Sequence, residues 1–314
     1  MSQNPSVKFL SKMCAVCRKD NVKIMPEFVM TVSIAAAGKS TWANAQEGYC
    51  VLDSDLIRKE LWGSETDQQN PDKVFNLMYR RAVEALSRDQ SVVYCATNLN
   101  MKYRVHTLNQ IKRRFPDVKC RAVVFNTPLS ICKEWNKKRE RQVPDWLFEQ
   151  QMKSFQMPVY NEGWDVIEIV TPAEYDVKKF AENMWADVRA VGSQDNPHHT
   201  LTLYDHLFDC INKINSTGLS DNEQVNMYAA AGIHDIGKAY TRSYDENGVA
   251  HYYSHDNYGA FLAMNMGLPI EVIQLVCYHM KPYDTNASSV WEKRLGEELW
   301  KKILILHDAD ERSH

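Results

Sequence analysis

The sequence lacks an apolar run of the roughly 18 residues that a membrane span requires, and it shows no signal peptide. We therefore expect no contact with a membrane. A disulfide framework is missing too, because the eight cysteines are scattered without even spacing, and this favours a reducing cytoplasm. An excess of charge of one sign is also missing. With a formal net charge of −3, any attraction for nucleic acid has to come from a local basic surface.

Cys14 and Cys17 form a CxxC pair near the N-terminus. The pair is compatible with half of a zinc site, but no second CxxC or CxxH pair lies nearby, and a structural zinc site needs four ligands. The sequence therefore favours two reduced thiols over a zinc knuckle.

The histidines divide the chain into two parts. Of the ten, only His106 lies in the first 197 residues. A chain of 314 residues is long enough for two domains of typical size. Gly, Ser, Asp, Asn and Pro cluster in "AVGSQDNPHH", residues 190–199, as in a linker. We predict an N-terminal extension over 1–25, one domain over 26–190 and a second over 191–314.

The first part alternates short apolar runs with amphipathic stretches, a pattern typical of a parallel sheet covered by helices. The runs are rich in β-branched residues, as buried parallel strands are. They are "FVMTVSI", "GYCVLD", "QSVVYCAT", "KCRAVVFN" and "DVIEIV". Between them, "DKVFNLMYRRAVEALSRD" has apolar residues at helical spacing. The sequence therefore predicts an α/β domain.

A phosphate-binding loop follows the first predicted strand. Gly38, Lys39 and Ser40 match the end of the P-loop pattern, whereas Ser33 replaces its first Gly. Backbone N–H groups of such a loop bind the phosphates of ATP, the Lys reaches the β and γ phosphates, and the Ser hydroxyl binds Mg²⁺. We expect Thr41 to start the following helix and to complete the ATP site, and Ser33 to add backbone strain if it needs an unusual φ. A chance Gly-Lys-Ser match is the alternative, which the preceding strand disfavours.

Asp55 and Arg58 follow the second predicted strand, which ends at Asp53. This arrangement resembles the polynucleotide kinases of phage and bacterial end-healing systems. The resemblance implies that Asp55 is the general base for a 5′-hydroxyl acceptor and that Arg58 holds the acceptor's phosphate. A carboxylate suits the first role because it can accept the hydroxyl proton during in-line attack. Alternatively, Asp55 is a helix N-cap and Arg58 an exposed residue of the first turn.

Two further stretches extend the resemblance. "YCATNLN" resembles the Asp-x-Thr-Asn-Leu-Asn segment of these kinases, and we take Ala96 as the replacement of the Asp. "WNKKRERQVPDW" resembles their lid, which implies that Arg139 or Arg141 stabilises the migrating phosphoryl group. The alternative for the lid is a solvated basic helix face.

The second part contains separated histidines and aspartates in the order His, His-Asp, His, His, Asp. This order resembles the HD-domain metal-dependent phosphohydrolases, and it implies an all-α domain, in which we also expect "AFLAMNMGLPIEVIQLV" to be amphipathic and helical. The resemblance implies a primary metal site formed by His206, His234, Asp235 and Asp310. Imidazoles and carboxylates of this kind bind divalent ions such as Mn²⁺, Ni²⁺, Fe²⁺ or Co²⁺.

Three other residues belong to the same expected site. His255 and His279 match positions that hold a second metal in some HD proteins and contact the phosphate in others, so the number of metal ions stays open. Either histidine alone is as well explained as a hydrogen-bonded core residue. Lys238 is placed to neutralise a substrate phosphate.

Together the two resemblances imply a bifunctional end-healing enzyme in a bacterial or phage-infected cytoplasm. Its kinase would phosphorylate 5′-hydroxyl ends of nucleic acid, mainly RNA, with ATP and Mg²⁺, and its HD domain would process 2′,3′-cyclic or 3′ phosphates, so that a ligase can act next. The main alternative is an HD nucleotidase or cyclic-nucleotide phosphodiesterase with a degenerate, nucleotide-sensing kinase domain. A non-catalytic RNA-binding module and a small-molecule kinase are further alternatives.

Overall fold

The computed structural model describes residues 25–65, 70–197, 200–284 and 286–313. Cys14, Cys17 and nearly all of the predicted N-terminal extension lie outside these residues, as do His198, His199 and His314. In the described ranges, we find no helix with the length and apolarity needed to cross a bilayer.

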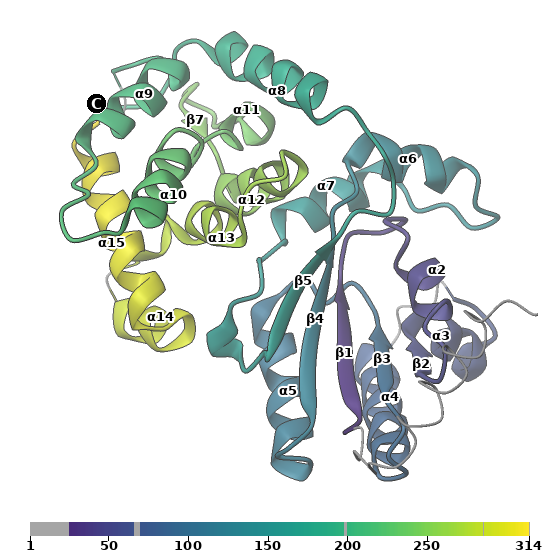
Figure 1. Cartoon of the computed structure of the whole chain (residues 1–314). Coiled ribbons are helices and arrows are strands. Elements are labelled where there is room, and N and C mark those ends of the chain that lie inside the picture. The colour runs from purple at the N-terminus through teal and green to yellow at the C-terminus, as the bar shows by residue number, and fades with distance from the viewer. Residues whose placement is uncertain (1–24, 66–69, 198–199, 285, 314) are drawn as a thin grey trace, which may run out of the picture.

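A parallel five-stranded sheet forms the centre of the first domain (Figure 1). Its strands are β1 (Glu27–Val32), β2 (Cys50–Asp53), β3 (Val92–Cys95), β4 (Lys119–Phe125) and β5 (Val166–Val170). The strand order is β2-β3-β1-β4-β5, and every neighbouring pair is parallel. Residues 28–32 of β1 are all buried, as expected for a strand with helices on both faces of its sheet. The predicted parallel sheet is confirmed.

Helices connect and cover these strands. They are α2 (Lys39–Asn44), α3 (Ser54–Trp62), α4 (Pro71–Leu86), α5 (Met101–Arg114), α6 (Leu129–Lys137), α7 (Asp145–Lys153), the 3₁₀ turn η1 (Tyr160–Glu162) and α8 (Val177–Val191). α2 begins two residues before the predicted Thr41, because Gly38 takes a left-handed φ of 91° that turns the loop directly into the helix. The carboxyl ends of β1, β2 and β3 meet at one edge of the sheet, where open α/β sheets place their ligands.

The second domain is mainly helical. It contains α9 (Leu203–Lys213), α10 (Asp221–Ala231), α11 (Lys238–Thr241), α12 (His255–Asn265), α13 (Ile270–Tyr278), η2 (Lys281–Tyr283), α14 (Ser288–Leu295) and α15 (Glu297–Glu311). A small antiparallel hairpin of β6 (Ser243–Tyr244) and β7 (Ala250–His251) departs from the all-α expectation. The boundary between residues 190 and 191 stays a prediction.

The stretch that we expected to be amphipathic is not. It forms two helices, α12 and α13, which separate at Gly267, with a φ of 72°, and Pro269. Residues 258–265 and 272–278 are buried on every side. Helices that are apolar all round occupy the centre of a domain, and these two form the core of the second domain.

The two domains pack against each other through the chain that follows α7. The rings of Phe155 and Phe261 meet edge to face, with centroids 5.6 Å apart. The Tyr278 hydroxyl donates to the Met157 carbonyl at 2.6 Å, and the Gln274 amide donates to the Pro158 carbonyl at 2.7 Å. Figure 1 shows α7 beside α12 at this junction. The domains therefore share one continuous apolar core.

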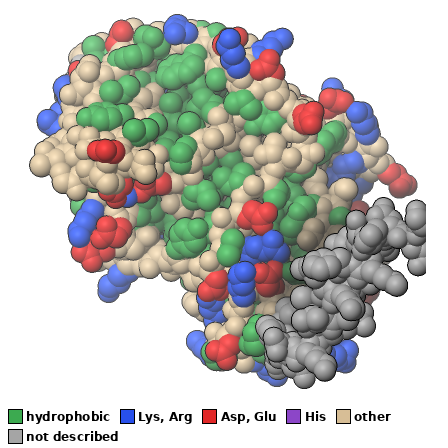
Figure 2. All heavy atoms as spheres, in the orientation of Figure 1, with side chains coloured by type: hydrophobic (Ala, Val, Ile, Leu, Met, Phe, Trp, Pro, Cys, Tyr) green, Lys and Arg blue, Asp and Glu red, His purple; other side chains and the backbone are tan. Residues whose placement is uncertain are grey.

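The surface carries charges of both signs. Figure 2 shows basic and acidic side chains interspersed on the visible face, rather than gathered into one basic surface. This mixture agrees with the net charge of −3. Contact with nucleic acid would therefore depend on a few local cations.

A fully buried ion pair supports the turn after β3. The Arg104 guanidinium donates to both carboxylate oxygens of Glu162, at 2.8 and 2.6 Å, and its remaining amino group donates to the carbonyls of Asn98 and Leu99. Neither charged side chain is exposed to solvent. The Trp164 indole N–H also donates to Glu162. The pair ties the end of β3 to the loop before β5.

We predict that Arg104→Ala lowers the free energy of unfolding by about 3–5 kcal/mol, because Glu162 would remain buried without its cation. Urea unfolding followed by tryptophan fluorescence measures this change. The matched control is Arg88→Ala, which removes an exposed arginine paired with Glu84 and should change the free energy by less than about 0.5 kcal/mol. Equal effects of the two substitutions would contradict the structural role of Arg104.

Candidate functional site

The loop between β1 and α2 has the shape of a phosphate-binding loop. A Cβ atom on Gly38 would lie 3.3 Å from both Pro172 and Trp135, in addition to requiring a positive φ, so the position favours glycine. The Thr127 hydroxyl donates to the Ala37 carbonyl at 3.0 Å and holds the loop from the side of β4. The backbone is thus fixed next to the N-terminus of α2.

Ser33 does not strain this loop. Its φ is not positive; the positive values fall at Ala36, with 53°, and at Gly38. The condition for strain at Ser33 is therefore not met, and the cost of about 1 kcal/mol for a left-handed residue falls on Ala36. The Ser33 N–H donates to the Thr97 carbonyl, while its buried hydroxyl has no hydrogen-bond partner among the described residues.

Lys39 and Ser40 lie at the start of α2, where a nucleotide phosphate and its cation would bind. The Lys39 ammonium has no hydrogen bond or ion pair with any residue that the structure describes. The Ser40 hydroxyl donates to the Asp53 carboxylate at 2.8 Å. Asp53 therefore joins the residues expected at the phosphate-binding loop. Its position at the end of β2 was the only signal for it in the sequence. The Thr41 residue is exposed.

The acidic position of the strand β3 segment is Cys95, not Ala96. The pattern Asp-x-Thr places the acid two residues before Thr97, and the Cys95 thiol donates to the same Asp53 oxygen at 3.5 Å. Burial, and then the charge of Asp53, raise the pKa of the Cys95 thiol to about 12. Cys95 is therefore a neutral group beside Ser40, where these kinases have a second carboxylate.

The structure brings Asp55, Arg58 and Arg141 together. Asp53 is the N-cap of α3 and accepts the Asp55 N–H, so Asp55 is not the cap. Arg58 is buried, and it donates to the Asp55 carboxylate at 2.9 Å. The alternative of a capping Asp55 with an exposed Arg58 is therefore wrong. Arg141 Nη1 lies 3.7 Å from the other oxygen of Asp55.

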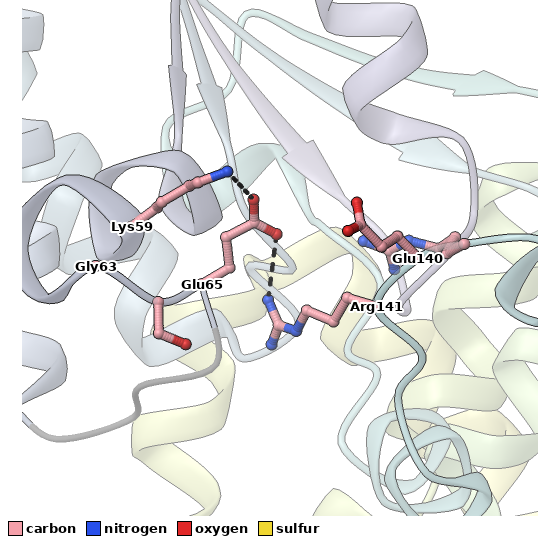
Figure 3. Close-up of a pocket in the computed structure, with 7 residues that line it drawn as sticks. Lys59, Gly63, Glu65, Glu140 and Arg141 are labelled. Carbon is pink, nitrogen blue, oxygen red and sulfur yellow. Dashed lines mark ion pairs between the residues drawn. The ribbon is translucent and has the colours of Figure 1, made fainter.

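The lid arginines lie in the loop between α6 and α7, rather than on the face of a helix. Beside them is a cavity of about 550 Å³, shown in Figure 3. Its lining consists of Lys59, Gly63, Ser64, Glu65, Arg139, Glu140 and Arg141. Of the two candidate lid arginines, Arg141 is the one whose side chain approaches Asp55.

α7 also reaches the phosphate-binding loop. The Gln151 side chain accepts the Ala35 N–H at 2.7 Å. Two residues further on, at the last residue of the same helix, the Asn257 amide of α12 donates to the Lys153 carbonyl. Neither contact was predicted, because neither residue belongs to a recognisable motif.

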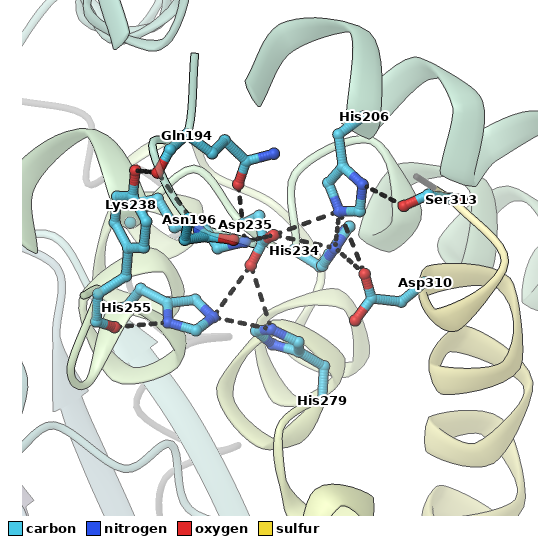
Figure 4. A network of polar contacts seen from close by, with 12 residues as sticks. Gln194, Asn196, His206, His234, Asp235, Lys238, His255, His279, Asp310 and Ser313 are labelled. Carbon is cyan, nitrogen blue, oxygen red and sulfur yellow. Dashed lines mark hydrogen bonds and ion pairs between the residues drawn. The ribbon is translucent and has the colours of Figure 1, made fainter. Parts of the chain in front are cut away.

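Four imidazoles converge in the second domain (Figure 4). A hydrogen bond between Nδ1 and a backbone carbonyl oxygen, 2.7–2.9 Å long, orients each ring. The carbonyl belongs to Ser313 for His206, Ala231 for His234, Tyr252 for His255 and Val276 for His279. The Nε2 atoms are thereby turned toward the centre. Bonds of this kind orient histidines that ligate metals.

Asp235 lies between two groups of these nitrogens. Its Oδ2 is 3.3 Å from His206 Nε2 and 3.5 Å from His234 Nε2, whereas its Oδ1 is 3.0 Å from His255 Nε2 and 3.4 Å from His279 Nε2. Asp310 completes the first group. The structure thus forms two candidate metal sites that share one carboxylate: His206, His234, Asp235 and Asp310, and Asp235, His255 and His279.

Neighbouring groups hold the two aspartates. Lys238 Nζ is 2.6 Å from Asp235, and it also donates to Gln194. Burial acts to raise the pKa of the Asp235 carboxyl, but Lys238 and the imidazoles hold it well below its usual value. The Tyr283 hydroxyl donates to Asp310 at 2.9 Å. Gln194 and Tyr283 were missed from the sequence, since neither is a metal-ligand type.

Glycine is required where α11 meets α12. A Cβ atom on Gly237 would lie 2.0 Å from the His255 carbonyl oxygen. This close approach brings His255 next to Asp235. By contrast, the nearby Asp308 is exposed and pairs with Arg312.

Comparisons with known proteins agree with this division. Residues 28–158 match the family model described as an AAA domain, and residues 198–313 match that of the HD domain. The chain thus has an α/β domain that is similar to AAA domains, followed by a helical domain that is similar to HD domains. The predicted order of the two domains is therefore confirmed, and no curated protein sequence matches the chain.

Two solved structures are similar to parts of the chain. One is described as the structure of the Pnkp1/Rnl/Hen1 RNA repair complex, with 16% identity, a TM-score of 0.36, and coverage of 43% of this chain and 46% of that chain. The other is a putative kinase from Chloroflexus aurantiacus J-10-fl, with 13% identity, a TM-score of 0.41, and coverage of 53% and 97%. The match to the RNA repair complex thus spans less than half of its chain.

We predict that the protein binds two Mn²⁺ ions per chain and that His279→Ala binds one, because this change removes a ligand of the second group alone. Equilibration with Mn²⁺, desalting and mass spectrometry of the metal content measure the stoichiometry. The control is His106→Ala in the first domain, which should keep two ions. A single ion in the unchanged protein would contradict the shared role of Asp235.

Proposed function

We propose that this protein heals both ends of a broken RNA strand. The first domain transfers the γ-phosphoryl group of ATP to a 5′-hydroxyl end, and the HD domain hydrolyses a 2′,3′-cyclic or 3′ phosphate. The observation that carries this proposal is that one chain holds two separate polar clusters: Ser40 of the loop, linked through Asp53 to Asp55, and the imidazole and carboxylate cluster that shares Asp235. The products of both reactions are the ends that a ligase joins, so a ligase is the expected partner.

In the first site, each residue supports one part of phosphoryl transfer. Lys39 and the loop N–H groups hold the phosphates, and Ser40 with Asp53 would hold Mg²⁺. Asp55 accepts the proton as the 5′ oxygen bonds to the γ-phosphorus and ADP leaves. Arg58 orients Asp55, and Arg141 approaches the same carboxylate, so both are placed to bind the oxygens of the acceptor and of the migrating group.

In the HD site, the imidazole and carboxylate ligands fit borderline divalent ions. Two ions bound there would supply a hydroxide nucleophile near neutral pH. The protein's own part is to hold the Nε2 atoms through backbone carbonyls and to keep Asp235 ionised through Lys238. Because Lys238 is buried and paired with Asp235, we assign it this positioning role together with partial neutralisation of the substrate phosphate.

A second candidate function is an HD nucleotidase with a nucleotide-sensing first domain. The Gln151 side chain accepts the Ala35 N–H of the phosphate-binding loop, so this N–H is not available to a phosphate. Because Cys95 is not an acid, Asp53 provides the single carboxylate beside Ser40. Both features favour a weak kinase. In this function the loop would bind a nucleotide without transferring its phosphate.

The test uses an oligoribonucleotide with a 5′-hydroxyl and a 2′,3′-cyclic phosphate, incubated with labelled ATP and Mg²⁺ or Mn²⁺. We predict that both ends change. Asp55→Asn should lower 5′ labelling at least about 100-fold and leave the 3′ reaction intact, because it removes the general base alone. Asp235→Asn should have the reverse effect. Separation of the products on a denaturing gel reports both ends in one reaction.

Each other result has a defined meaning. A changed 3′ end without 5′ labelling would reject the kinase and keep the HD phosphohydrolase. Two unchanged ends, together with hydrolysis of free nucleotides, would favour the nucleotidase. The same melting temperature for both variants and the unchanged protein ensures that a lost activity reflects lost chemistry.

A further inference from the structure

Tyr283 lies at the boundary between the metal-ligand candidates and solvent. The residue is 44% exposed, although its hydroxyl donates to Asp310 Oδ2 at 2.9 Å. The other carboxylate oxygen, Asp310 Oδ1, is 3.1 Å from His206 Nε2 and 3.2 Å from His234 Nε2. One oxygen of Asp310 therefore contacts the imidazoles, and the other contacts Tyr283.

The cluster is open to solvent at two of its side chains. His255 and Asp310 are 8% and 9% exposed. The remaining ligand candidates are at most 3% exposed; they are His206, His234, Asp235 and His279. Within the described ranges, a substrate therefore reaches the cluster beside His255 and Asp310, and Tyr283 lies at the second of these positions.

A histidine holds the Tyr283 ring in place. The rings of Tyr283 and His307 meet edge to face, with centroids 4.4 Å apart and an interplanar angle of 89°. His307 lies on α15 one turn before Asp310, so both side chains are on one face of that helix. The His307 Nδ1 atom is buried and makes no hydrogen bond with any residue that the structure describes. Polar capacity beside Tyr283 is therefore left for a ligand.

The chemistry of Tyr283 defines the group that it can bind. An ionised carboxylate only accepts hydrogen bonds, so the phenol proton is committed to Asp310. The phenol oxygen then has only acceptor capacity left. Phosphate oxygens are acceptors as well, and they find no partner in it. A hydroxyl group of the substrate does, because it can donate.

We propose that Tyr283 selects a phosphate ester whose sugar keeps a free hydroxyl beside the phosphate. The inference rests on the proposed function of the HD domain and deepens it by naming the sugar. When a 2′,3′-cyclic phosphate opens, one of the two ribose oxygens keeps the phosphate and the other becomes a free hydroxyl. A 3′ phosphate on DNA has no such group. The HD domain therefore acts on RNA ends, and Tyr283 is the residue that distinguishes them from DNA ends.

The experiment compares two short oligonucleotides that both end in a 3′ phosphate and differ only in the 2′-hydroxyl of the last nucleotide. Release of phosphate by the Mn²⁺-loaded protein gives kcat/KM for each. We expect the ribose end to be preferred about tenfold, as one hydrogen bond provides. Tyr283→Phe removes the hydroxyl and keeps the ring against His307, so it should reduce this ratio to about one.

The matched control is Tyr160→Phe, which removes the hydroxyl of an exposed tyrosine in the first domain and should keep the preference. An equal loss for both oligonucleotides in Tyr283→Phe would give this residue only a structural role at Asp310 and would overturn the inference, as would an unchanged ratio.

The proposed function and the inference fail separately. If the unchanged protein hydrolyses neither oligonucleotide, the proposed HD function fails, and fluorescence anisotropy of the same pair, labelled at the 5′ end, decides the inference. Tighter binding of the ribose end that Tyr283→Phe abolishes supports it, and equal binding of the two ends overturns it. If both ends are hydrolysed equally well by the unchanged protein, the function stands and the inference is overturned.

Discussion

Both candidate sites depend on the packing of residues 153–158 against the second domain. Phe155 and Met157 are fully buried there, and the Tyr278 hydroxyl and Gln274 amide bind the backbone of Met157 and Pro158. The helices they meet carry the metal-ligand candidates, since α12 begins at His255 and α13 ends just before His279. A close-packed core resists small displacements. The first domain therefore packs directly against the helices that carry the candidate imidazole ligands of the second domain.

The same junction leads back to the phosphate-binding loop by two routes. Through α7, the Gln151 side chain binds the Ala35 N–H, while Asn257 of α12 binds the Lys153 carbonyl. Through the end of β4, Thr127 binds the Ala37 carbonyl, and its neighbour Asn126 accepts from Asn265 at the end of α12. Contacts therefore run continuously from the loop to both ends of α12.

The sequence predicted what local pattern determines. Runs of β-branched residues identified the strands, and the resemblance of the order His, His-Asp, Asp to HD domains identified His206, His234-Asp235 and Asp310, which the fold does bring together. It did not predict the carboxylate that two ligand groups share, because the orientation of Asp235 depends on Lys238 and on the close approach at Gly237. Our reading misplaced the altered acidic position by one residue, although the pattern Asp-x-Thr itself points to Cys95, whose thiol contacts Asp53 in the structure.

The two departures from the kinase pattern act on different groups. At Ser33, the backbone N–H donates to the Thr97 carbonyl and the hydroxyl is buried, so the serine fits the loop without a left-handed backbone conformation. At Cys95, a neutral thiol replaces a carboxylate, and Asp53 alone supplies negative charge beside Ser40. The site therefore retains Lys39 and the loop N–H groups but has lost one anion. In the proposed kinase, the remaining groups would attract phosphate oxygens, whereas Mg²⁺ would be held less tightly before ATP brings its own oxygens to the ion. Metal and nucleotide should then bind to the loop together, as one unit.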